Sequence, residues 1–267
     1  SGVLDFFIEK DLFFENNYGV SAGACHLCSY LAKQYKRAFR VNVDYLNDKR
    51  YCSVHSLLKT GNLFGAEMLY DIIPNELDLF DYDTYNKNES NFYVVITDIN
   101  TGKPEYVKIG DLKKDIIYVR ASSSLPLLAQ NVKINDKEYL DGGISDSIPI
   151  KKSIADGNKK NVVILTRDST YRKGKNSLMP IIKLKYKKYP NFVKSMADRY
   201  IVYNEILDFI KELEDNGDVF VIRPKKPVNI GRTEKNREKL EALYNDGYND
   251  AKDCYEELLK YLGKENL

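Results

Sequence analysis

Long apolar runs, abundant cysteine and a strong excess of either charge are all missing from this chain of 267 residues. No apolar run approaches the roughly 18 residues of a membrane-spanning helix, which excludes such a helix. The four cysteines are too few for a secreted scaffold held by disulfides, so we expect reduced thiols and a cytoplasmic protein. With 41 basic and 39 acidic side chains the net charge is +2, which predicts no strong overall attraction to nucleic acid.

Strand-like and helix-like segments alternate along the chain. Apolar, β-branched and aromatic runs predict strands at 92–97, 161–165 and 218–222 and a hairpin at 132–140. The short apolar run at 161–165 is typical of a central parallel strand. Apolar residues at helical spacing predict helices over 3–8, 22–37, 199–214 and 234–262. The alternation indicates an α/β protein.

One short motif carries chemistry. Residues 19–23 read Gly-Val-Ser-Ala-Gly, a G-x-S-x-G pattern between a predicted strand and a predicted helix. In that setting a sharp turn lifts the hydroxyl of Ser21 above the sheet, and Gly19 and Gly23 have no Cβ to clash as the chain reverses. The N–H of Ala22 and the helix N-terminus then point at a developing oxyanion. The alternative is a tight turn with an incidental serine.

A nucleophilic serine needs a base, and histidine is scarce, with only His26 and His55 in the chain. The usual order of nucleophile, acid and then histidine is impossible, and His26 lies one turn beyond Ser21 on the same predicted helix. A carboxylate can act as the base where its surroundings raise its basicity. Asp141, which begins an Asp-Gly-Gly turn after the predicted hairpin, is the leading candidate, and Asp146 is its rival.

Together these segments resemble the bacterial patatin-like phospholipase family. The family's G-x-S-x-G elbow corresponds to 19–23 and its D-G-G motif to 141–143. Between them, Ala-Ser-Ser-Ser-Leu-Pro at 121–126 is similar to the family's A-S-x-A-x-P segment, with Ser124 in place of the usual alanine. The resemblance covers roughly residues 2–225.

The resemblance implies a serine acyl hydrolase that cleaves lipid acyl esters, as a phospholipase A or lysophospholipase does, through an acyl-enzyme. Ser21 would be the nucleophile and Asp141 the base, with Ala22 as an oxyanion donor and with Gly142 and Gly143 in support. No metal ion and no cofactor are implied. The alternative is a non-catalytic protein of the same fold that binds lipids or membranes.

The implied fold is a three-layer α/β sandwich with a central, mostly parallel sheet and a C-terminal helical segment. We expect a hydrolase domain over 1–230 and a helical extension over 231–267 that packs on it. The family's first central strand and its glycine-rich oxyanion loop, G-G-G-x-R/K-G, are expected upstream of Ser1.

The near-zero net charge hides an uneven distribution. Residues 1–150 carry a net charge of −5, residues 151–200 one of +11 and residues 201–267 one of −4. Within 171–194 the basic side chains alternate with aliphatic and aromatic ones, which suits peripheral docking on an anionic membrane. A solvated helix face is the plainer interpretation. A nucleic-acid binder is the third hypothesis, although we expect no nucleic-acid partner.

The cysteines leave one further alternative open. Cys25 and Cys28 have C-x-x-C spacing, and Cys52 and His55 are also three residues apart. Four such ligands could form a zinc site. The plainer interpretation is a set of small side chains buried on helices.

Overall fold

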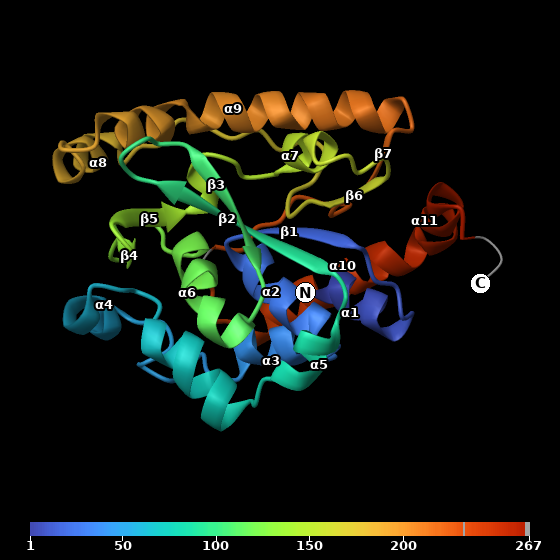
Figure 1. The fold of residues 1–267 in the computed structure, drawn as a ribbon, viewed down its shortest axis with the longest axis horizontal. Helices are drawn as coiled ribbons and strands as arrows, with labels where there is room; N and C mark the ends of the chain where they lie inside the picture. The colour runs from blue at the N-terminus through green and yellow to red at the C-terminus, as the bar shows by residue number, and fades with distance from the viewer. Residues whose placement is uncertain (232, 265–267) are drawn as a thin grey trace.

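The computed structural model describes residues 1–231 and 233–264, which form two β-sheets surrounded by helices (Figure 1). In the five-stranded sheet the strands follow the order β1-β2-β5-β4, and β3 also pairs with β2. These strands are β1 (Asn16–Val20), β2 (Asn91–Asp98), β3 (Pro104–Ile109), β4 (Val132–Ile134) and β5 (Lys137–Asp141). The second sheet pairs β6 (Asn161–Ile164) with β7 (Val219–Ile222). Strand β2 is therefore the centre to which three other strands attach.

The larger sheet is mixed, so the prediction of a mostly parallel sheet is wrong. Among its described strands β1 and β2 run parallel, whereas the pairs β2–β3, β2–β5 and β4–β5 are antiparallel. Residues 99–103 connect β2 to β3, and residues 135–136 connect β4 to β5. Strands joined by such short loops pair antiparallel, because a parallel crossover needs about a dozen residues or more. The predicted strand at 161–165 is parallel, but it lies in the smaller sheet.

Helices cover both faces of the larger sheet (Figure 1). On one face lie α7 (Ile150–Ala155), α8 (Met179–Lys185) and α9 (Pro190–Asp215). On the other lie α1 (Gly2–Glu9), α2 (Ala22–Leu31), α6 (Leu112–Ser122) and α10 (Arg237–Asp253). The remaining helices are α3 (Arg37–Val43), α4 (Val54–Thr60), α5 (Tyr82–Lys87), α11 (Tyr255–Leu262), the π-helical η1 (Met68–Leu77) and the 3-10 turn η2 (Gly142–Ile144). The α/β class is confirmed, and within the described residues no helix is long and apolar enough to cross a membrane.

The main apolar core lies between the sheet and the helices of the second group. Phe6 of α1, Leu27 of α2 and Val94 of β2 are among its buried members. A second cluster on the opposite face joins Leu140 of β5 to Ile182 of α8. Both faces of β2 and β5 are thus covered, and the ends of these strands are held firmly in place.

The helix that follows Ser21 is shorter than the sequence pattern predicts. α2 ends at Leu31 instead of continuing to residue 37, and α3 begins after a break. Lys33 and Lys36 adopt left-handed backbone conformations, with φ of 53° and 59°, which no α-helix can contain. Tyr35, which continued the apolar spacing beyond Leu31, is 42% exposed and does not pack in the core that buries α2.

The C-terminal helices pack on the N-terminal helix. The predicted helix at 234–262 consists of α10 and α11, which meet at Cys254. A Cβ on Gly2 would lie 2.1 Å from the carbonyl oxygen of Tyr244, so α1 and α10 approach each other more closely than larger residues allow. The ring of Phe6 makes edge contacts with Tyr248 and Tyr255, at centroid distances of 5.3 and 5.2 Å. The proposed division into domains at residue 231 stays a prediction.

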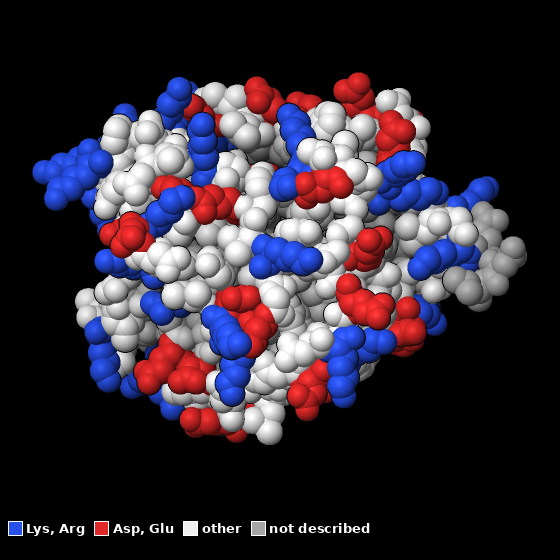
Figure 2. All heavy atoms as spheres, viewed as in Figure 1, with Lys and Arg blue, Asp and Glu red and all other residues white. Residues whose placement is uncertain are grey.

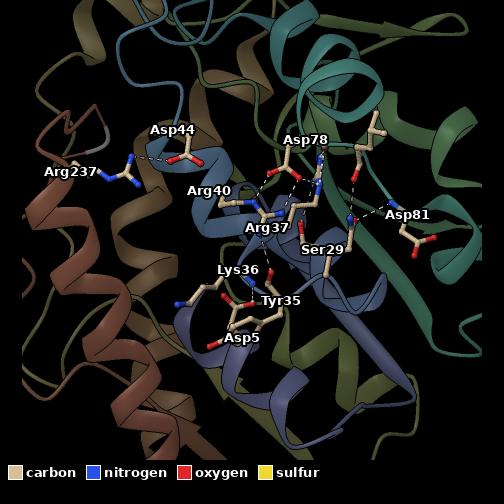
Figure 3. Close-up of polar contacts among 12 residues, drawn as sticks. Asp5, Ser29, Tyr35, Lys36, Arg37, Arg40, Asp44, Asp78, Asp81 and Arg237 are labelled. Carbon is tan, nitrogen blue, oxygen red and sulfur yellow. Dashed lines mark hydrogen bonds and ion pairs between the residues drawn. The ribbon is translucent and has the colours of Figure 1, made fainter.

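A buried ion-pair cluster ties α3 to the loop after η1 (Figure 3). Arg40 donates to both carboxylate oxygens of Asp78, at 2.8 and 3.0 Å, and Arg37 donates to the Asp78 carbonyl at 2.8 Å. The Arg37 and Asp78 side chains are only 8% and 12% exposed. An exposed ion pair between Arg237 and Asp44, at 2.9 Å, links α10 to the C-terminal end of α3.

We expect Asp78→Ala to lower the free energy of unfolding by about 3 kcal/mol, because it leaves the buried Arg37 guanidinium without its carboxylate. Urea unfolding followed by circular dichroism measures this. Asp44→Ala is the matched control, since it removes an exposed pair and should cost about 0.5 kcal/mol. Equal losses in the two variants would contradict the stabilising role of the buried cluster.

Candidate active site

Strand β2 brings the ends of two other strands together. Val20, the last residue of β1, pairs with Val95, and Asp141, the last residue of β5, pairs with Ile96. Since β1 runs parallel to β2 and β5 runs antiparallel, their carboxyl ends approach each other from opposite directions at adjacent residues of β2. The serine after β1 and the aspartate at the end of β5 therefore meet, although 120 residues separate them in the chain.

The turn after β1 has the strained geometry of a nucleophile elbow. Ser21 has φ of 54° and ψ of −125°, a backbone conformation that costs a non-glycine residue about 1–3 kcal/mol. Gly19 is required here, because a Cβ would lie 2.6 Å from the Cα of Ala24. The steric reason proposed for Gly23 is wrong, since a Cβ there would meet nothing within 4 Å. Gly23 instead leaves open space beside the serine.

Ser21 and Asp141 form a direct hydrogen bond. The Ser21 hydroxyl donates to Oδ2 of Asp141 at 2.7 Å, and Asp141 is only 2% exposed. Oδ1 of the same carboxylate accepts the N–H of Gly143 at 2.8 Å, which fixes the orientation of the carboxylate. A Cβ on Gly142 would lie 2.0 Å from the carbonyl oxygen of Val95, so the Asp-Gly-Gly turn needs glycine in order to pass β2.

Neighbouring polar groups hold the backbone on both sides of this pair. The Thr97 hydroxyl donates to the carbonyl oxygen of Asp141 at 2.8 Å, and the N–H of Asp141 donates to the carbonyl oxygen of Ser124 at 2.8 Å. The N–H of Ser21 donates to Oγ of Ser122, which is fully buried at the end of α6, at 2.9 Å. Neither Thr97 nor Ser122 is among the site residues predicted from the sequence. The only signal was the position of Ser122 in the 121–126 segment.

The first turn of α2 lies next to the serine hydroxyl. The carbonyl oxygen of Ser21 accepts the N–H groups of Ala24 and Cys25, so the helix begins immediately after the elbow. Ala22 and Gly23 are exposed at this helix N-terminus, where backbone N–H groups and the helix dipole favour negative charge. The arrangement can stabilise an oxyanion that forms beside Ser21.

An arginine from α9 supports the aspartate loop. Nε of Arg199 donates to the carbonyl oxygen of Gly143 at 2.5 Å, and the Ser147 hydroxyl donates to the same oxygen at 2.6 Å. A Cβ on Gly143 would lie 3.2 Å from Nη2 of Arg199. Arg199 lies on α9, 58 residues beyond Asp141 in the chain, and it is not among the site residues predicted from the sequence.

The rival bases lie elsewhere. Asp146 accepts a hydrogen bond from the Tyr106 hydroxyl at 2.7 Å, and burial raises the pKa of its carboxyl. Nε2 of His26 contacts Nδ2 of Asn42 at 3.2 Å, and burial holds the pKa of the His26 imidazole well below its usual value. His55 is exposed on α4. Among the candidates weighed from the sequence, Asp141 is the one whose contact with the Ser21 hydroxyl is observed.

The C-x-x-C cysteines make local contacts. Sγ of Cys25 lies 3.3 Å from Oγ of Ser123, and the Cys28 thiol donates to the carbonyl oxygen of Ala24 at 3.3 Å. Within residues 1–231 and 233–264 no three histidine, cysteine or acidic side chains lie close enough together to hold a metal ion. The zinc-site alternative therefore gains no support from the described residues.

A small cleft of about 20 Å³ lies near the Ser21–Asp141 pair, although neither of these two residues lines it. Ser123 and Ser124 line it, and these residues contact Cys25 and the Asp141 backbone. Its other walls are Asn62, Phe64, Ala66, Tyr70, Arg120, Leu125, Leu128 and Ala129. The lining is about equally polar and apolar, and the guanidinium of Arg120 adds a positive charge.

The chain belongs to the patatin-like phospholipase family. The family's sequence pattern matches residues 1–153, which are more than half of the chain. The resemblance inferred from the motifs is thus confirmed. A second match, to a domain of unknown function (DUF6363), covers residues 189–263. The uncharacterized protein YjjU of Escherichia coli (strain K12) is 26% identical over 245 residues, which cover 85% of this chain and 65% of YjjU. The chain thus spans just under two thirds of the length of that relative.

Proposed function

We propose that this protein is a serine acyl hydrolase that cleaves lipid acyl esters, with Ser21 as the nucleophile and Asp141 as its base. The observation that carries the proposal is the 2.7 Å hydrogen bond from the Ser21 hydroxyl to the buried carboxylate, on a strained turn at a helix N-terminus. Membership of the patatin-like phospholipase family supports it. The helices on the two faces of the sheet would form the outer layers of a three-layer sandwich.

The proposed reaction has two steps. Asp141 takes the proton of Ser21 as Oγ attacks the ester carbonyl, and the N–H of Ala22 stabilises the oxyanion. The ester C–O bond then breaks, the leaving alcohol takes the proton from Asp141, and the acyl group stays on Ser21. Asp141 next takes a proton from water, the resulting hydroxide attacks the acyl-enzyme, and the carboxylic acid leaves as Ser21 regains its proton.

Membership of the patatin-like phospholipase family favours a lipid as the substrate. Near the site, Phe64, Leu125 and Leu128 add apolar side chains, and Arg120 adds a cation that suits an anionic group on the same molecule. A phospholipid or a lysophospholipid carries both features. Phospholipase A or lysophospholipase activity is therefore the specific form of the proposal.

Covalent labelling tests the nucleophile. A fluorophosphonate probe should phosphonylate Oγ of Ser21 with loss of fluoride, and peptide mass spectrometry of the full-length protein should locate the adduct there. Ser123→Ala is the matched control, because Ser123 lines the neighbouring cleft and its loss should leave labelling intact. Labelling that persists in Ser21→Ala, or that depends on Ser123, would refute the assignment.

Arg199 is expected to be a positioning residue for the base. Arg199→Ala removes the hydrogen bond to the Gly143 carbonyl, so kcat for a p-nitrophenyl acyl ester should fall roughly 10–100-fold while KM stays within about twofold. Arg199→Lys, which keeps a donor, should recover part of the loss. Arg172→Ala is the matched control, since Arg172 pairs with exposed Asp208. A rise in KM at constant kcat would instead assign Arg199 to substrate binding.

A further inference from the structure

Helix α8 is fixed to the core by one of its sides. Ile182 and Tyr186 are 1% and 2% exposed and belong to the apolar cluster that contains Leu140 and Ile144. Leu140 immediately precedes Asp141, and Ile144 follows the Asp-Gly-Gly turn. The position of α8 is therefore coupled by direct packing to the strand end that carries the proposed base.

The opposite side of α8 exposes aliphatic side chains. Leu178, which caps the N-terminus of α8, and Ile181 and Leu184 within the helix are 48%, 54% and 73% exposed, at intervals of three residues. Residues at this spacing lie on neighbouring turns of one helix surface. Single exposed leucines are ordinary, but three in a row on one short helix make an apolar ridge.

Lysines surround this ridge, and acidic residues are absent from the segment. Lys183, Lys185, Lys187 and Lys188 are all exposed, and no Asp or Glu occurs between Asp168 and Asp198. Figure 2 shows Lys and Arg side chains projecting from the end of the molecule where α8 lies. The ridge and its lysines, residues 178–188, are called the α8 surface below.

A groove adjoins the α8 surface. A cleft of about 310 Å³ lies between α8 and α9, with Met179 and Ile201 as apolar lining and Lys175 and Lys183 as basic lining. Asp198 also lines it. The ammonium group of Lys175 lies 5.8 Å from the centre of the Tyr200 ring. The mixture of apolar and cationic groups matches a lipid headgroup region, where phosphates lie above acyl chains.

We propose that the α8 surface docks the protein on an anionic phospholipid bilayer. The aliphatic ridge enters the boundary between headgroups and acyl chains, while the surrounding lysines contact lipid phosphates and carboxylates. This docking role rests on the proposed function. Docking through α8 would hold the Asp141 loop at a constant position relative to the lipid layer that contains the substrate.

Vesicle co-sedimentation in a Ser21→Ala background tests docking without any hydrolysis. Binding should be much stronger to phosphatidylcholine vesicles that contain phosphatidylserine than to phosphatidylcholine alone. Lys183→Gln with Lys185→Gln should weaken binding to the anionic vesicles by roughly 20–30-fold. Leu184→Ser should weaken it by about tenfold. Equal binding to neutral and anionic vesicles would overturn the proposal.

Matched control variants distinguish binding through the α8 surface from nonspecific electrostatic and hydrophobic binding to vesicles. Lys87→Gln with Lys114→Gln removes two exposed lysines from α5 and α6, and Leu79→Ser removes a similarly exposed leucine. These variants should bind like the parent protein. A loss with the lysine variant but none with Leu184→Ser would show a purely electrostatic contact with the vesicles and would overturn insertion of the aliphatic ridge. Because hydrolysis is absent throughout, failure here leaves the Ser21 labelling result unaffected.

Discussion

Ser21→Ala should lower kcat for a p-nitrophenyl acyl ester by roughly 10⁵–10⁶-fold. The reason is that the substitution removes the atom that forms the acyl-enzyme. Within residues 1–231 and 233–264, no other hydroxyl in the site combines a strained turn, a helix N-terminus and a 2.7 Å bond to a buried carboxylate. Stopped assays with the full-length protein measure the change, and Ser123→Ala should retain nearly full turnover.

The same position separates catalysis from stability. Alanine keeps the Cβ and therefore the strain of φ 54°, so Ser21→Ala should unfold at close to the parent's urea midpoint. Ser21→Gly relieves that strain and should raise the free energy of unfolding by about 1 kcal/mol while the protein stays inactive. Turnover by either variant above about 1% of the parent's rate would remove Ser21 from the mechanism.

Asp141→Asn should lower kcat by about 10⁴-fold, because an amide cannot accept the proton of the Ser21 hydroxyl. The amide oxygen can still accept the N–H of Gly143, so the loop should keep its conformation and the protein its stability. Progress curves for ester hydrolysis, with circular dichroism as a check of folding, measure both effects.

Asp146→Asn is the matched control for Asp141→Asn. Asp146 lies five residues downstream, and its contact is with the Tyr106 hydroxyl. Its loss should change kcat by no more than about threefold, because the substitution alters one hydrogen bond that does not involve Ser21. If the two aspartate variants lost activity equally, the base would have to be reassigned.

Local chemistry in the sequence predicted several features of the site. The G-x-S-x-G and D-G-G patterns depend on backbone geometry within a few residues, as Gly19 against Ala24 and Gly142 against Val95 illustrate. Such requirements leave a visible pattern of glycine, so Ser21 and Asp141 could be selected. The steric role assigned to Gly23 shows the limit of this reasoning, because a motif does not say which of its glycines is crowded.

Other features depend on residues distant in the chain and left no local pattern. The mixed sheet follows from which strands pair with β2, and hydrophobic periodicity does not encode pairing partners. Ser122 and Thr97 act through single hydrogen bonds to backbone groups, and Arg199 reaches the loop from α9. Serine, threonine and arginine are common on any surface, so only the position of Ser122 within the 121–126 segment gave a signal.

The amino-acid sequence by itself determined the α/β class, the family and the two motifs, because these depend on local backbone requirements and side-chain periodicity. Tertiary structure alone decided that the carboxyl ends of β1 and β5 meet at Val95 and Ile96 of β2. It also decided that the lysine-rich segment presents an aliphatic ridge on α8. The physical reason is the same in both cases, since long-range packing decides which strand ends meet and which helix side stays in water.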